Sequence, residues 1–83
     1  MASIEEKLQE ARAQYAEDSE SVKNLRYHLE RLRDEYIENM YPMTGKEFGK
    51  EHARLERLIE KTERRMKKTS GKISVLKAKL NKQ

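Results

Sequence analysis

Cysteine and tryptophan are both absent from this chain of 83 residues, and proline occurs once. Without cysteine, the chain has neither a disulfide framework nor a thiolate metal site, and nothing marks it for an oxidising compartment. A domain this short buries too little of its surface to be more than marginally stable without an additional stabilising feature. With disulfides excluded, we expect oligomerisation to supply the additional stability.

Long apolar runs are also missing, since no stretch approaches the roughly 20 residues that a transmembrane helix needs. The first residues include Glu5 and Glu6, where a signal peptide would have positive charge followed by an apolar stretch. We therefore expect a cytoplasmic, intracellular protein that does not act at a membrane and is not exported by a cleaved signal.

Catalytic motifs are likewise lacking. The three glycines stand apart and form no phosphate-binding loop, and no nucleophile motif is present. His52 and Glu56 lie one helical turn apart, but a metal site usually needs three or four ligands, so we interpret His52 as a polar layer between packed helices. The sequence predicts a protein that is not an enzyme and takes no cofactor, metal or small-molecule substrate.

Charged residues make up 41% of the chain and hydrophobic residues 35%, a composition that fits either disorder or a long helix rich in surface. Periodicity decides for the helix, because apolar residues recur at alternating steps of four and three, the heptad pattern of a coiled coil. The first series is Ile4, Leu8, Ala11, Tyr15, Val22, Leu25, Leu29, Leu32 and Tyr36, interrupted at Asp18. The second is Phe48, His52, Leu55, Ile59, Thr62, Met66, Thr69, Ile73, Leu76 and Leu80.

Local signals place the helix boundaries. Ser3 with Glu6, and Thr44 with Glu47, have the spacing of capping boxes that begin helices. Pro42 ends the first helix because proline donates no backbone hydrogen bond and disfavours helical geometry in the preceding residue. We predict one helical-hairpin domain over residues 1–83, with a first helix over about 4–40, a turn over about 40–44 and a second helix over about 45–82.

A short turn between two heptad helices predicts an all-α fold, an antiparallel two-helix coiled-coil hairpin in which the numbers of facing seam residues add up to 84. Sixteen of the twenty seam residues are then apolar. Asp18 is expected to form a polar layer, reaching toward Arg65 or Lys68 and fixing the alignment of the helices.

The two edges of this seam differ in charge. On one edge Glu5 faces Lys77 and Arg26 faces Glu56, which favours the register. On the other edge Glu35 faces Glu51 and Lys7 faces Lys79, and His28 lies beside an apolar Leu58. We predict that His28 and Leu58 mark the edge at which two hairpins form a homodimer, a four-helix bundle.

Apolar residues also crowd the turn: Ile37, Met40, Tyr41, Met43 and Phe48. They serve either as a plug that closes the end of the bundle or as a surface that binds a protein partner, and both roles can hold together. Methionine and tyrosine adapt to partner surfaces at low entropic cost, which favours partner binding.

Basic residues dominate the end of the chain, which has no acidic residue after Glu63. These basic residues are Arg64, Arg65, Lys67, Lys68, Lys72, Lys77, Lys79 and Lys82. Such a run is typical of a protein that binds nucleic acid or an acidic partner, although the hairpin lays it beside an acidic stretch of the first helix that offsets part of its charge. No aromatic residues interleave the lysines for base stacking.

These patterns favour a small regulatory protein-protein interaction module, acting as an adaptor, scaffold or inhibitor through a rigid coiled coil and an apolar turn. The alternative is an accessory protein that binds nucleic acid through the basic half of the second helix. The steep weakening of phosphate binding by salt distinguishes the two.

Overall fold

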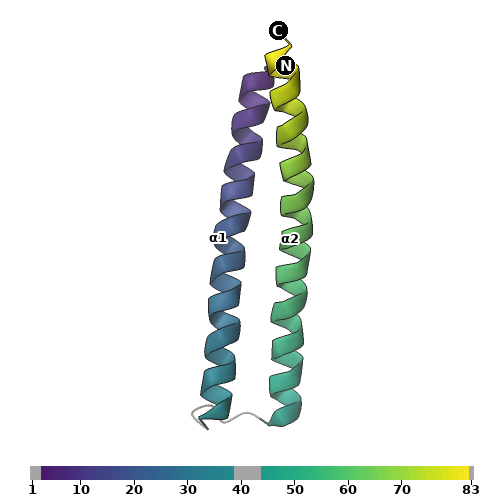
Figure 1. The fold of residues 1–83 in the computed structure, drawn as a ribbon. Coiled ribbons are helices and arrows are strands. Elements are labelled where there is room, and N and C mark those ends of the chain that lie inside the picture. The colour runs from purple at the N-terminus through teal and green to yellow at the C-terminus, as the bar shows by residue number, and fades with distance from the viewer. Residues whose placement is uncertain (1–2, 39–43, 83) are drawn as a thin grey trace.

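Two long helices make up the described part of the chain, residues 3–38 and 44–82 of this computed structural model. Helix α1 (Ile4–Ile37) and helix α2 (Gly45–Asn81) pack against each other and run in opposite directions (Figure 1). The start of α1 and the end of α2 meet at one end of the molecule, the open end, and the other end is the turn end. The all-helical hairpin is therefore confirmed, and the two described ranges contain no strand.

Both helices begin where the capping residues predict. The Ser3 hydroxyl accepts the backbone N–H of Glu6 at 3.1 Å. At the second start, the Thr44 hydroxyl accepts the N–H of Glu47 at 3.1 Å, and the Glu47 carboxylate accepts the N–H of Thr44 at 3.2 Å. These contacts satisfy amide groups that the first turn of a helix leaves without an internal partner.

Helix α1 ends earlier than the position of Pro42 suggests. Its last helical residue is Ile37, three residues before the predicted end near residue 40, and Glu38 caps it. The last turn contains no basic side chain, while Asp34, Glu35 and Glu38 place negative charge at the helix end whose dipole is already negative. These charges disfavour continuation of the helix.

The predicted register is confirmed at both ends of the rod. At the open end Leu8, Ala11 and Leu76 form a buried cluster, with Ile4, Ile73 and Leu80 packed against it. At the turn end the rings of Tyr36 and Phe48 stack with centroids 4.2 Å apart. In this register every seam residue is buried or half-buried except Tyr15, which is 38% exposed.

The most buried residue is charged rather than apolar. Asp18 is 1% exposed and receives three hydrogen bonds: Arg65 Nε to Oδ2 at 2.9 Å, Arg65 Nη2 to Oδ1 at 2.6 Å, and Gln14 Nε2 to Oδ1 at 3.0 Å. The hydrogen bonds from Arg65 lower the pKa of Asp18 below its ordinary value, although burial acts in the opposite direction. Of the two bases expected to reach this layer, Arg65 is the one that does.

The molecule is a rod with little interior. Its radius of gyration is 18.3 Å, whereas a globular chain of this length has a value of about 12 Å. Seven apolar side chains are buried in the described ranges. Most of the surface of both helices is consequently available for contact with another molecule.

Candidate interaction surfaces

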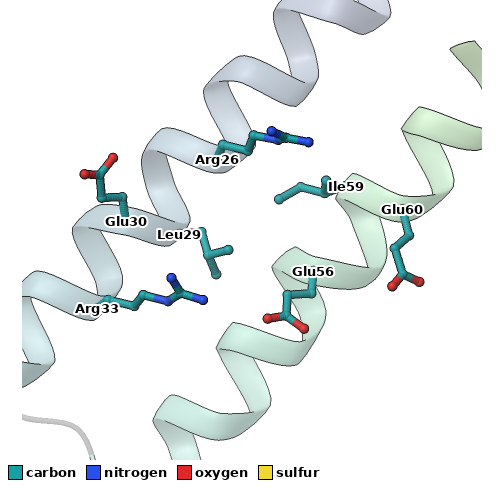
Figure 2. A pocket seen from close by; sticks show the side chains of 7 residues that line it. All are labelled: Arg26, Leu29, Glu30, Arg33, Glu56, Ile59 and Glu60. Atoms are coloured by element: carbon teal, nitrogen blue, oxygen red, sulfur yellow. The ribbon is translucent and has the colours of Figure 1, made fainter.

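One side of the hairpin carries an open groove between the helices, which we call the Arg26 face. Its turn-end half is a hollow of about 510 Å³ (Figure 2). Leu29 from α1 and Ile59 from α2 point toward one another across its floor. The hollow is lined by Arg26, Leu29, Glu30, Arg33, Glu56, Ile59 and Glu60. An apolar floor with a charged rim is the usual composition of a protein interface.

The groove continues toward the open end. A second hollow, of about 500 Å³, also has Arg26 in its wall and is floored by Tyr15, Val22 and Met66. Between the two helices, Arg26 Nη2 pairs with Glu63 Oε1 at 3.0 Å. The expected pairing of Arg26 with Glu56 is therefore replaced by one with Glu63, seven residues later in α2.

A chain of hydrogen bonds explains why Glu56 is engaged elsewhere. Arg33 Nε donates to His52 Nε2 at 3.0 Å, and His52 Nδ1 lies 3.0 Å from Glu56 Oε1. With Nε2 accepting, the imidazole carries its proton on Nδ1 and donates it to Glu56. His52 is half-buried within the seam, so the arrangement agrees with the interpretation of this residue as a polar layer.

The opposite side, the His28 face, holds the predicted dimer edge. His28 is exposed and Leu58 is 38% exposed. The facing glutamates of this edge each have an arginine on their own helix: Arg31 Nη2 lies 3.2 Å from Glu35, and Arg54 pairs with Glu51. The hydrogen bond from Arg54 lowers the pKa of Glu51. Like-charge repulsion across this edge is thus relieved within the hairpin.

The turn end contains one anchored and one exposed apolar side chain. Phe48 is half-buried, stacked on Tyr36 and tilted against His52 with centroids 5.6 Å apart. Ile37, in contrast, is 77% exposed. Phe48 therefore closes the end of the hairpin, whereas Ile37 is free to contact another molecule. Three further residues of the predicted turn surface, Met40, Tyr41 and Met43, lie outside the described residues.

The basic residues near the open end divide into engaged and unengaged groups. Arg65 is held by Asp18, and Arg64 Nη2 lies 3.9 Å from Glu60. Within the described ranges no ion pair involves the lysines of this stretch, and the expected pairing of Glu5 with Lys77 is not among the ion pairs formed there. The exposed lysines are Lys67, Lys68, Lys72, Lys77, Lys79 and Lys82. The acidic stretch of α1 thus engages the arginine of this region more than its lysines.

Nowhere in residues 3–38 and 44–82 do three histidine, aspartate or glutamate side chains gather closely enough to hold a metal ion. Neither α1 nor α2 contains, in its described residues, an apolar stretch long enough to cross a membrane.

Sequence reasoning missed the Arg26 face as a surface. It treated the charges along this edge only as register pairs, although basic residues on the turn-end half of the first helix face acidic residues on the second, a signal already present in the sequence. The structure adds that the ten residues flanking the seam on this side are all exposed, while Ser21, Glu35 and Glu51 on the opposite side are half-buried. The residues that flank the seam are thus more exposed on the Arg26 face, although the His28 face also has a hollow, of about 590 Å³, lined by Leu25, Leu32 and Leu55 among others.

Comparisons with known proteins found no match to a family model, a curated protein or a solved structure.

Proposed function

We propose that this chain is a non-enzymatic protein-protein interaction module, an adaptor, scaffold or inhibitor, that presents the turn end of a rigid hairpin to a protein partner. The observation that carries the proposal is the 77% exposure of Ile37 beside the anchored aromatic residues of the turn end. An exposed isoleucine next to a rigid, closed helix end supplies apolar area without a large loss of entropy on binding.

The rest of the molecule supports this role. The helices hold the turn end at one extremity of a rod 60 Å long, away from the basic open end. The aromatic stack of Tyr36 on Phe48 holds the two helices together beside Ile37. A partner would therefore meet a preorganised surface, and a homodimer forming a four-helix bundle would present two such surfaces together.

The test is capture of protein partners from the cell that makes this chain, with Ile37→Ser compared with wild type. Val75→Ser is the matched control, because Val75 is 55% exposed and lies on α2 far from the turn. The capture is carried out in the presence of nuclease, which removes nucleic acid. Under these conditions we expect Ile37→Ser to lose the captured protein and Val75→Ser to retain it. Both variants should keep the helical signal and unfold within about 1 kcal/mol of wild type, as exposed substitutions usually do.

A second variant extends the test to the turn itself. Tyr41→Ser with Met43→Ser should also abolish capture if these residues belong to the same surface. If Ile37→Ser and Tyr41→Ser/Met43→Ser each capture the partner as well as wild type does, the proposal is wrong. If Tyr41→Ser/Met43→Ser instead loses stability, those two residues belong to the plug, and Ile37→Ser alone decides the question.

A second candidate function, nucleic-acid binding, is favoured by one observation: the exposed lysines of α2 make no ion pair within the described ranges. Lys68, Lys72 and Lys79 recur at steps of four and seven and so share one flank of the helix. Such a stripe attracts phosphates without reading sequence.

Binding of a duplex RNA or DNA probe, measured as a function of salt, tests this candidate. Each phosphate contact contributes about −0.9 to the slope of log K against log salt on duplex DNA. Replacing Lys68, Lys72 and Lys79 with alanine should flatten that slope by about 2 to 3 on DNA. Replacing Lys46 and Lys50, near the turn end, should leave it nearly unchanged. Absence of probe binding at low salt would exclude the candidate.

A further inference from the structure

We infer that two copies of this chain associate through their Arg26 faces, in parallel, with the two turn ends side by side. The inference rests on the proposed function, because it specifies which face forms the homodimer and how the two turn surfaces are displayed. It differs from the sequence prediction, which placed the dimer edge at His28 and Leu58 on the other face.

Charge on the Arg26 face is unequally divided between the helices. The α1 edge carries Arg26, Arg33 and Glu30, and Lys23 lies one heptad before Glu30 on the same strip, so basic residues predominate. The α2 edge carries Glu56, Glu60 and Glu63 with one basic residue, Lys67, so acidic residues predominate. The basic edge of one copy is consequently complementary to the acidic edge of another.

The register determines which residues would meet. Facing residues of the two helices have numbers that add up to 84, so Lys23 lies at the level of residue 61 and Arg26 at the level of residue 58. A two-fold axis parallel to the helices sets α1 of each copy against α2 of the other at equal level. Lys23 of one copy then lies beside Glu60 and Glu63 of the second copy, with Arg26 between Glu56 and Glu60.

The other face-to-face arrangement is unfavourable. A two-fold axis perpendicular to the helices sets α1 against α1 and α2 against α2, so that the basic edges meet each other and the acidic edges do the same. Like charges placed together across an interface cost several kcal/mol in general. Complementarity therefore selects the parallel arrangement, in which the turn ends coincide.

The groove also offers enough apolar and total area. Leu29 and Met66 are half-buried and Tyr15 is 38% exposed in the single hairpin, so a second copy would cover side chains that remain accessible to water. The molecule is 60 Å long and 19 Å wide. The projected area of one side is therefore larger than the roughly 800 Å² that each partner buries in a standard interface.

Charge reversal on the purified chain tests the inference, with self-association measured by sedimentation equilibrium. Lys23→Glu and Glu60→Lys should each raise the dimer Kd at least about tenfold, because each sets like charges together at two symmetric places. An equimolar mixture of the two variants should restore dimers, since every α1 edge then meets an opposite charge. Lys50→Glu, on the outer side of α2, changes net charge as Lys23→Glu does and should leave the Kd unchanged.

Three results would overturn the inference. The first is a folded wild-type monomer at about 100 μM, far above the dissociation constants of stable complexes. The second is a dimer that withstands both reversals but is lost in Leu58→Lys, which would assign the interface to the His28 face. The third is a mixed dimer of Lys23→Glu with wild type that is tighter than either homodimer. This result would show that α1 of one copy packs against α1 of the other. Ile37 lies one heptad after Glu30 on the strip that also holds Lys23, so the dimer Kd of Ile37→Ser is measured as well. Loss of partner capture with an unchanged dimer Kd contradicts the proposed function alone, whereas loss of the dimer with capture retained contradicts this inference alone.

Discussion

Arg65 forms two parallel hydrogen bonds with Asp18, joining the middle of the two helices through a carboxylate that is 1% exposed. The Arg65 side chain as a whole remains more than half exposed. A two-pronged contact of this kind fixes both the distance and the direction of its partner, so it tolerates no sliding of one helix past the other. The pair specifies the alignment of the hairpin at the one seam position of α1 that lacks an apolar side chain.

This pair predicts a pH dependence of stability. The pKa of Asp18 is lowered on folding, so its contribution to stability is present above the ordinary carboxylate pKa and is lost as pH falls through the folded value. Asp18→Asn should be less stable than wild type at pH 7, and the difference should shrink below about pH 4. Thermal unfolding followed by circular dichroism at fixed protein concentration measures both.

A matched control separates this effect from general acid sensitivity. Glu20 on the same helix is exposed and forms no ion pair or side-chain hydrogen bond within the described ranges. Glu20→Gln should show no such pH-dependent difference from wild type. A difference between Asp18→Asn and wild type that stays constant from pH 7 to pH 2.5 would contradict the role assigned to the carboxylate. Glu51 also contributes to the pH dependence of stability, but it is present in both Asp18→Asn and wild type, so its contribution cancels in the difference between them.

Two leucines three residues apart on α2 should respond differently to truncation. Leu55 is 6% exposed in the seam, whereas Leu58 is 38% exposed on the His28 face. Leu55→Ala should reduce the free energy of unfolding by about 2 to 4 kcal/mol because it leaves a cavity between the helices. Leu58→Ala should cost about 1 kcal/mol or less. Equal losses in urea unfolding would indicate that Leu58 is buried in an interface, as the sequence prediction of the dimer edge requires.

The helical content is itself a strict prediction. Helix α1 has 34 residues and α2 has 37, which together exceed four fifths of the chain. Far-ultraviolet circular dichroism should report a helical fraction well above the one third that is average for globular proteins. A value below one half would be incompatible with two continuous helices.

Heptad periodicity predicted the helices, the register and several individual contacts. Tyr36 faces Phe48 and Leu8 faces Leu76 because the 3.5-residue repeat and a short turn leave one alignment that pairs apolar residues. The polar layer at Asp18 follows from the same alignment. The sequence could offer two partners for that layer, and side-chain geometry selected Arg65.

Other features depend on details that the repeat does not specify. Arg26 pairs with Glu63 because its long side chain reaches along the helix, while Glu56 is bound by His52. Helix α1 ends at Ile37, before Pro42, and its last turn has no basic side chain. The Arg26 face emerged only once the exposure of the two sides could be compared, because the seam pattern treats both sides alike. The charged residues that line it could nevertheless be identified from the sequence.

Disulfide trapping of the register tests the central claim, an intramolecular antiparallel hairpin. The native chain has no cysteine, so Leu8→Cys with Leu76→Cys introduces the only two thiols, at neighbouring positions of the buried open-end cluster. Oxidation at low protein concentration should give a monomeric cross-linked chain in high yield. The control pair Leu8→Cys with Leu55→Cys places the thiols about 30 Å apart along the rod and should not form this product. Cross-links that form only between chains, or equally in both pairs, would contradict the hairpin.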